Sequence, residues 1–199
     1  MAKILRLVLV LTVITVVSGL SLSYVHKITA GPIKLTKIKE VKAPAVREVF
    51  KGLGADNDFM ADLREIPVGK DARGKDIMRY AFPAKKGGKI IAVAIEAFGN
   101  GYHEGLGVMT AIGLEGELKD KIIRIAVTSS HETPGKGDRA TGPSDEGRGF
   151  RKKFVGLSVA EKVEGIDALS GATMTSTGML EAVNRALEIF KANKDKIVS

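Results

Sequence analysis

A long uncharged apolar run near the N-terminus constrains this chain more than any other feature. No residue from Leu7 to Val25 carries a charge, and the run is rich in Leu, Val and Ile. About 20 apolar residues suffice to cross a bilayer as a helix. Lys3 and Arg6 precede the run, and no A-x-A pattern follows it, so an uncleaved anchor is favoured over a signal peptide. We therefore expect a single-pass membrane protein.

The remainder of the 199-residue chain is long enough for one domain, since domains take roughly 100–200 residues. Gly31-Pro32 to Pro44 is interpreted as a stem after the anchor and carries many lysines. We therefore predict three parts: a membrane anchor at 1–27, a basic stem at 28–45 and one folded domain at 46–199.

Composition excludes several functions. The net charge of +8 raises nucleic acid or an anionic membrane surface as a partner, but a run of lysines with few acidic residues falls in the stem and aromatic residues make up only 5%. Single-strand binding needs aromatic residues interleaved with basic ones, so no nucleic-acid partner is expected. The chain has no cysteine, which excludes disulfides, thiolate nucleophiles and Cys-ligated iron–sulfur clusters. Redox work would need an organic cofactor.

The middle of the chain predicts consecutive strands, and its C-terminal end predicts a helix. Apolar and β-branched runs separated by turn residues indicate strands at 77–82, 89–98, 107–114 and 121–130, the first of them ended by Pro83. Further predicted elements are a helix at 46–53, a helical turn or two at 59–66, a partly helical segment at 144–154 and a last strand at 157–163. The final helix presents an apolar face at helical spacing, formed by Met179, Leu180, Val183, Ala186, Leu187 and Phe190. The predicted fold class is α+β, an antiparallel sheet with flanking helices.

A segment rich in hydroxyl groups, Ser170 to Thr177, precedes this final helix. A helix N-terminus presents unpaired N–H groups and partial positive charge, which favour a phosphate. Gly171 and Ala172 would let the backbone approach an anion closely. The alternative is an ordinary N-cap, since Ser and Thr are favoured there. The segment is not a P-loop, because the G-x-x-x-x-G-K-[ST] spacing is absent.

The stretch from Asp167 to Thr173 reads D-A-L-S-G-A-T. It resembles the D-x-x-[ST]-G-A-T flavinylation motif of the FMN-binding domain family. Members occur in the G subunit of Rnf-type electron transport complexes and in the C subunit of sodium-translocating NADH:quinone reductases. The resemblance implies FMN attached through a phosphoester to Thr173 by a separate flavin transferase that uses FAD. It also assigns cofactor-binding roles to motif and neighbouring residues: Asp167, Ser170, Gly171, Ala172, Thr175 and Ser176.

A second loop carries the same resemblance independently. His131 to Gly137 reads H-E-T-P-G-K-G and is similar to the H-x-E-T-P-G-x-G loop that lies beside the flavin ring in this family. The copy departs from the pattern in two ways: His131 abuts Glu132 directly, and Lys136 replaces an apolar residue. Further expected FMN contacts are Glu132, Thr133, Pro134, Gly135 and Lys136, with Tyr102 from the glycine-rich loop at 99–105.

The resemblance implies a function as well as a cofactor. It implies an electron-carrying subunit on the inner (plasma) membrane, with its soluble domain on the extracytoplasmic (periplasmic) side and other integral membrane redox subunits as partners. The chain is not expected to turn over a soluble substrate alone. The length of the chain favours the Rnf G subunit over the C subunit of the quinone reductase.

Two other classes remain open, a free-standing flavin reductase domain and a membrane-tethered phosphate-binding module without redox activity. No metal site is expected, because His103, Glu104 and His131 lack ligand spacing. Charges flanking the anchor leave the topology close to undecided.

Overall fold

A computed structural model describes residues 2–70 and 72–198, which form two compact units divided between Glu40 and Val41. The first unit is built on helix α1 (Ala2–Lys37). Its stretch from Lys3 to Ala30 is long and apolar enough to cross a membrane, and the side chains there are exposed. A π-helical turn, Ile38–Lys42, follows at the boundary between the units.

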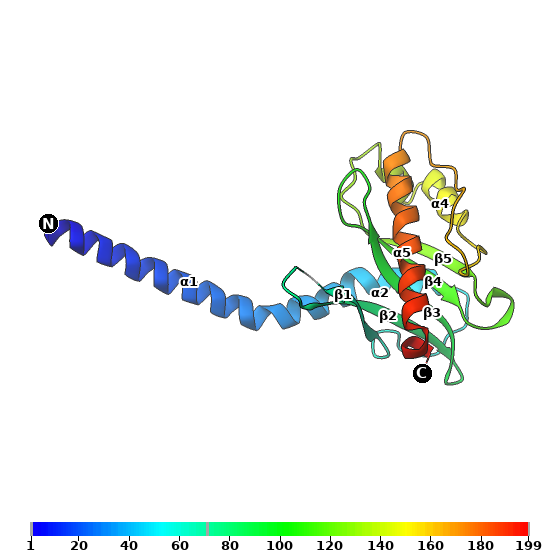
Figure 1. Ribbon diagram of the computed structural model, residues 1–199, viewed down its shortest axis with the longest axis horizontal. Coiled ribbons are helices and arrows are strands. Elements are labelled where there is room, and N and C mark those ends of the chain that lie inside the picture. The colour runs from blue at the N-terminus through cyan, green and yellow to red at the C-terminus, as the bar shows by residue number, and fades with distance from the viewer. Residues whose placement is uncertain (1, 71, 199) are drawn as a thin grey trace. The chain divides into compact units, whose positions relative to one another are not determined.

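The second unit is a five-stranded antiparallel sheet with helices on its faces. The strands are β1 (Arg64–Lys70), β2 (Asp76–Lys86), β3 (Lys89–Gly99), β4 (Leu106–Gly113) and β5 (Ile122–Ser129). They lie side by side in chain order (Figure 1). A 3₁₀ turn at Gly116–Leu118 connects β4 to β5. The predicted α+β class and antiparallel sheet are confirmed.

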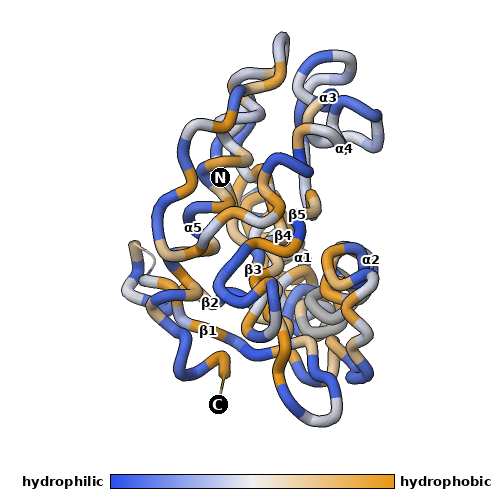
Figure 2. The backbone as a smooth tube through the Cα atoms, turned by 90° about the vertical axis from the view of Figure 1, so that its right-hand side faces the viewer, coloured by the Kyte–Doolittle hydropathy of each residue, from blue (hydrophilic) through white to orange (hydrophobic). Residues whose placement is uncertain are grey.

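Each face of the sheet has its own apolar layer, because successive side chains of a strand point to opposite faces. Helix α5 (Thr173–Val198) packs on β3 and β4, where Val93, Ile95 and Ala97 join its core. Helix α2 (Ala43–Val49) packs on β4 and β5. Figure 2 shows α5 and α2 on opposite sides of the strands. Small residues such as Ala92 and Ala94 alternate with the core positions of β3 and are fully buried.

Two short helices follow the sheet. Helix α3 (Asp138–Thr141) leaves the loop after β5, and α4 (Asp145–Lys152) follows it. The hydroxyl of Ser144 caps α4 by accepting a hydrogen bond from the Gly147 N–H at 3.1 Å. This confirms partial helix in the segment 144–154.

Two segments were predicted as the wrong type of element. The segment 59–66 was expected to be helical, but β1 begins at Arg64, and the burial of Ile66 between exposed Glu65 and Pro67 shows the period of a strand. The segment 157–163 was expected to be a strand, but it forms only an isolated bridge through Ser158.

The reason for the missing strand lies in α5. The Asn184 side chain accepts a hydrogen bond from the Val163 N–H at 2.8 Å and donates one to the Val163 carbonyl at 2.9 Å. A helix side chain therefore satisfies the backbone of Val163, whereas Leu157 and Val159 bond to Ile122 and Asp120 at the start of β5.

The segment predicted as a basic stem is helical. Helix α1 continues through Gly31 and Pro32, and the π-helical turn leads directly into α2. Pro44 lies in the first turn of α2, where a missing N–H removes no helical hydrogen bond. Pro44 is thus accommodated within the helical connection.

Pro83 was expected to end its strand, but β2 continues to Lys86. The pairing of β1 with β2 stops at Ala81, so the edge of β2 beyond it faces Asn57. The Asn57 amide donates to the Pro83 carbonyl at 3.0 Å and accepts from the Lys85 N–H at 2.7 Å. The N and O atoms of one strand residue point to the same edge of the strand. The nitrogen of Pro83 therefore points to the edge that Asn57 covers, where no neighbouring strand would accept a hydrogen bond from it.

Candidate functional site

The turn before α5 is shaped to present the first residues of that helix. Gly171 has a φ of +77°, a left-handed conformation that glycine adopts without steric cost. The Ala172 N–H donates to the Leu169 carbonyl at 2.9 Å, and α5 begins at Thr173. The first backbone amides of an α-helix have no partner within the helix. The turn therefore directs free N–H groups and the positive end of the helix dipole outward beside the Thr173 hydroxyl.

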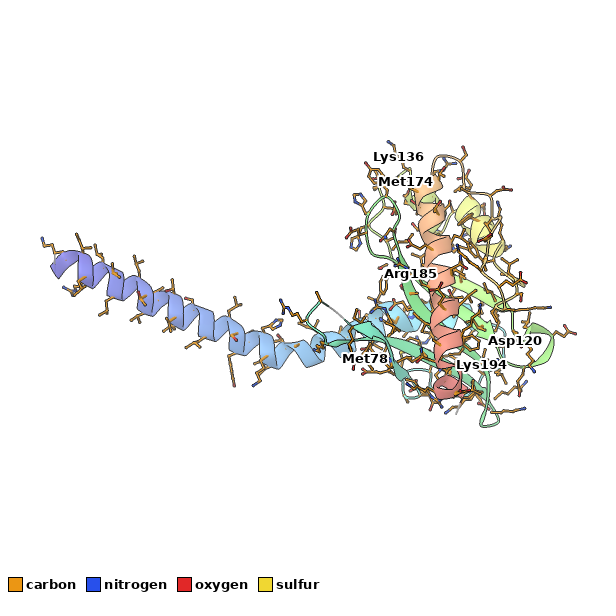
Figure 3. The ribbon with its side chains drawn as sticks, in the orientation of Figure 1. Met78, Asp120, Lys136, Met174, Arg185 and Lys194 are labelled. Atoms are coloured by element: carbon orange, nitrogen blue, oxygen red, sulfur yellow. The ribbon has the colours of Figure 1, made fainter. Side chains whose placement is uncertain are left out.

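A pocket of about 510 Å³ opens at this turn. This lies within the range of about 300–1,000 Å³ usual for small-molecule sites. Its lining residues come from the loop after β3, the loop after β5 and the start of α5: Tyr102, Thr133, Lys136, Gly137, Gly171, Ala172, Thr173 and Met174. Lys136 is the one charged residue of this lining. Figure 3 shows Lys136 and Met174 beside each other at the N-terminal end of α5.

Two large exposed apolar side chains line the same pocket. Tyr102 is 65% exposed and Met174 is 58% exposed. Flat aromatic ligands gain from such surfaces because apolar area leaves water on contact. The pocket thus combines a positive, N–H-rich end with apolar walls.

A buried pair lies beneath the pocket and joins its loops. The Thr175 hydroxyl donates to the Glu132 carboxylate at 2.8 Å, and both side chains are buried. The other Glu132 oxygen is 3.4 Å from the His103 N–H. A Cβ on Gly137 would lie 2.6 Å from the Thr175 hydroxyl, and one on Gly101 would clash with Glu132. Glu132 therefore ties both loops to the first turn of α5, and the two glycines make room for it.

The remaining predicted residues lie around the pocket without lining it. The Ser176 hydroxyl is buried and accepts from the Leu169 N–H at 3.1 Å. Asp167 is exposed, and its backbone carbonyl accepts from Lys153 at 3.1 Å. Pro134 is exposed and absent from the lining, while Gly135 lines an adjoining hollow. The structure thus gathers Tyr102, Thr133, Lys136, Gly171, Ala172 and Thr173 at one place.

Sequence reasoning missed three residues here. Gly137 and Met174 line the pocket, and both lie inside segments that the motifs had already marked. Arg139 had no signal in the sequence. Its Nη1 donates to the Ser170 carbonyl at 3.2 Å, and the carboxylate of Glu146 holds the same guanidinium through two bonds of 3.0 Å. Through its bond to the Ser170 carbonyl, Arg139 stabilises the turn that contains Gly171.

The buried pair leads to a first prediction. In Glu132→Gln, an amide NH₂ replaces one of two acceptor oxygens facing Thr175 and His103, so one donor loses its partner. We expect a loss of unfolding free energy of about 1–3 kcal/mol, measured by urea denaturation of the detergent-solubilised chain. The matched control is Glu164→Gln, at an exposed carboxylate 3.5 Å from Lys162, which should change stability by less than about 0.5 kcal/mol. Equal effects in both variants would contradict the structural role of Glu132.

Comparison with known proteins decides the family. Residues 101–188 match the model of the FMN-binding domain, and every residue that lines the pocket lies in this range. Over 181 residues the chain is 30% identical to the G subunit of the proton-translocating ferredoxin:NAD(+) oxidoreductase complex of Clostridium ljungdahlii, covering 89% of this chain and 86% of that protein. The chain belongs to the family of G subunits of ion-translocating oxidoreductase complexes. The resemblance found in the two sequence motifs is thereby confirmed.

Other G subunits match over nearly the whole chain. The G subunit of the ion-translocating oxidoreductase complex of Cereibacter sphaeroides is 29% identical over 96% of this chain and 86% of its own length. The G subunit of the Na(+)-translocating ferredoxin:NAD(+) oxidoreductase complex of Acetobacterium woodii is 26% identical over 94% of this chain and 91% of its own. Together with family membership, the apolar helix α1 marks this G subunit as a membrane-anchored protein that carries an FMN-binding domain.

Proposed function

We propose that this G subunit is an electron carrier whose FMN is attached through a phosphoester to Thr173. The observation that supports this proposal is the position of Thr173, the first residue of α5, on the lining of the pocket. A phosphate esterified there would lie beside the free amides and the positive end of the helix. Flavin supplies one- and two-electron chemistry when bound, and the protein supplies its position and electrostatic surroundings.

The neighbouring hydroxyls are less suited to be the acceptor. Thr175 and Ser176 are 1% and 2% exposed, and each is engaged in a hydrogen bond inside the domain. Thr173 is exposed and lines the pocket. An attachment enzyme needs access to the acceptor oxygen. Accessibility therefore favours Thr173 over the two hydroxyls that follow it.

The residues around Thr173 fit a flavin mononucleotide. The amides at the start of α5 and the ammonium of Lys136 would hold the phosphate or another electron-rich part of the cofactor, and no carboxylate belongs to the lining to repel it. Tyr102 and Met174 offer apolar contact for a flat ring, and Thr133 a hydroxyl. The buried Glu132–Thr175 pair and the Arg139–Glu146 pair keep the loops and the turn in place. Asp167 and Ser170 would then act through the shape of the turn or its recognition by the attachment enzyme.

The attachment is tested on the wild-type protein. Absorbance of the denatured, precipitated chain reports covalent flavin, because free FMN washes away. Tryptic mass spectrometry then locates the modified residue, and we expect FMN on the peptide that contains Thr173. FMN on Thr175, Ser176 or Thr177 would overturn the assignment, and no covalent FMN on a protein from a host with the attachment enzyme would overturn the proposed chemistry.

The names of the relatives supply the proposed setting. Two of them are subunits of ferredoxin:NAD(+) oxidoreductase complexes that translocate protons or sodium ions. We propose that this protein likewise passes electrons among integral membrane redox subunits, that ion movement is coupled elsewhere in the complex, and that a flavin transferase loads the FMN. Co-purification of the tagged chain with such subunits tests the partnership; recovery of the chain alone from mildly solubilised native membranes would contradict it.

The proposed setting places the soluble domain outside the cytoplasm, on the periplasmic side. Protease added to intact spheroplasts should then remove the domain and leave a membrane-protected fragment containing α1. We expect that N-terminal sequencing of the intact mature protein begins before Leu7, since we propose that the anchor is retained. Digestion that occurs only after lysis would place the domain in the cytoplasm, and a mature N-terminus beyond Ser21 would show that the anchor is cleaved.

Lys136 is expected to raise the flavin reduction potential. A cation beside the flavin favours the more negatively charged reduced form, so Lys136→Met should lower the midpoint potential. A change of about 30 mV corresponds to roughly 1.4 kcal/mol for a two-electron couple, and we expect a shift of that order in spectroelectrochemical titration. Lys162→Met, at an exposed lysine outside the pocket, is the control. An unchanged or higher potential in Lys136→Met would show that the ammonium does not act on the flavin.

A further inference from the structure

A basic cleft occupies the side of the domain where α2, β5 and α4 meet. Its volume is about 590 Å³, and it is lined by Glu48, Lys51, Arg124, Ile125, Arg148, Arg151, Lys152 and Val155. A smaller hollow of about 330 Å³ shares Glu48, Arg148 and Arg151 with it. The cleft has no lining residue in common with the pocket at Thr173. It is therefore a separate feature of the molecule.

Two arginines of the cleft are held in place by backbone carbonyls. Nη1 of Arg124 donates to the Glu48 carbonyl at 2.6 Å and approaches the Lys51 carbonyl at 3.3 Å, at the C-terminal end of α2. Nη1 of Arg151 lies 3.0–3.1 Å from three carbonyls at the end of α3. Both guanidiniums are anchored through one nitrogen. Because the guanidinium is a planar fork with five donors, each keeps further N–H groups for a ligand.

The charges of the cleft are unbalanced. Five cationic side chains line it, against the single carboxylate of Glu48. Arg148 pairs outside the lining with Asp145 at 2.6 Å. Burial lowers the pKa of Arg151, and nearby Arg148 lowers it further while Glu48 opposes the effect. Bringing a cation out of water is unfavourable unless an anion accompanies it. The cleft thus has an excess of positive charge, hydrogen-bond donors that are already in place, and room for an anionic ligand.

We propose that this cleft binds a phosphate group, either that of an anionic phospholipid headgroup or that of a soluble phosphate compound. Guanidinium forks match phosphate oxygens in pairs, and the two lysines add charge at the rim. The lipid source is included because the same chain carries an apolar helix long enough to cross a membrane.

A bound headgroup would give the domain a second attachment to the membrane beside the helix α1. Basic residues near an anionic membrane surface are attracted to it. Such an attachment would restrict the positions that the pocket at Thr173 samples. The proposal does not depend on flavin, so flavin loading and phosphate binding are tested separately.

The experiment uses the full chain in phosphatidylcholine nanodiscs. Inorganic pyrophosphate, titrated by calorimetry, probes a soluble phosphate, and nanodiscs with added phosphatidylglycerol probe a headgroup. Hydrogen exchange of α2 and α4 backbone amides reports occupancy in the second case. We expect saturable pyrophosphate binding, slower exchange in α2 and α4 with phosphatidylglycerol, or both. The triple variant Lys51→Gln, Arg148→Gln, Lys152→Gln changes exposed side chains only and should weaken either response at least about tenfold, the equivalent of roughly 1.4 kcal/mol.

The control removes three exposed lysines elsewhere, Lys70→Gln, Lys119→Gln, Lys162→Gln. It has the same net charge as the cleft variant. Retained binding in the control, with binding lost in the cleft variant, supports the proposal. A response to pyrophosphate alone assigns the soluble source, and a response to phosphatidylglycerol alone assigns the headgroup. Equal losses in both variants would assign the effect to net charge and overturn the proposal, as would the absence of a response to either probe in the wild type.

Discussion

Thr173→Ala should abolish covalent flavin while leaving the domain folded and the anchor inserted. The substitution removes the oxygen that forms the proposed ester, so the expected labelling is zero. Thr173 is exposed at the first position of α5. The free energy of unfolding should therefore change by less than about 0.5 kcal/mol, as for most surface substitutions. Absorbance of the precipitated protein and tryptic mass spectrometry measure the labelling, and circular dichroism measures the fold.

The neighbouring hydroxyls provide graded controls. Thr177 is exposed and lies one helical turn further along α5, so Thr177→Ala should keep full labelling and stability. Thr175→Ala should also keep the flavin, but it removes the bond to Glu132 and should cost about 1–3 kcal/mol of stability. Thr173→Ser keeps a hydroxyl, so labelling should persist to the extent that the attachment enzyme tolerates the missing methyl. Full labelling of Thr173→Ala would move the ester to another residue.

The sheet was predictable because its strands carry local signals. Lys89 to Phe98 is a continuous β-branched and apolar run, and Gly87-Gly88 between β2 and β3 marks a turn whatever lies around it. The segments that sequence reasoning placed wrongly depend on distant partners. Residues 157–163 resemble a strand, yet Asn184 in α5 takes both hydrogen bonds of the Val163 backbone. Pro83 resembles a strand end, yet Asn57 occupies the edge where its N–H is missing. Long-range hydrogen bonds made by single side chains do not change the hydrophobic periodicity of the sequence, so the sequence does not predict them.

At the site, too, features carried by consecutive residues were predicted, whereas contacts between distant segments were not. The turn before α5 was predictable because its residues are consecutive, and Gly171 adopts the left-handed conformation that such a turn requires. The motifs also marked Glu132 and Thr175 as neighbours of the cofactor. Their contact beneath the pocket, and the room that Gly101 and Gly137 leave for it, could not be foreseen from separate segments. Arg139 illustrates the limit, because an arginine that holds a carbonyl 31 positions away has no sequence signature.

The close approach of α5 to the loop after β3 gives a second large effect. A Cβ on Gly178 would lie 2.7 Å from the carbonyl carbon and oxygen of Asn100 and from the nitrogen of Gly101. These are backbone atoms of a loop already bound to α5, since the Asn100 N–H donates to Glu181 at 2.8 Å and Arg185 donates to the Phe98 carbonyl at 2.7 Å. The loop cannot move aside without breaking these bonds. Gly178 is thus required by close packing, although it lies inside a helix.

Gly178→Ala should therefore destabilise the domain even though alanine is the better helix former. Alanine gains about 1 kcal/mol over glycine inside a helix, but forced overpacking typically costs about 1–3 kcal/mol, and here it falls on backbone atoms. We expect a net loss of unfolding free energy of about 1–2 kcal/mol, together with weaker flavin labelling because Tyr102 belongs to the displaced loop. Gly149→Ala in α4 is the matched control. A Cβ there would meet open space, so this variant should be stabilised by up to about 1 kcal/mol. Urea denaturation compares the two, and a Gly178→Ala protein as stable as Gly149→Ala would show that the loop yields freely and that the contact does not position the pocket.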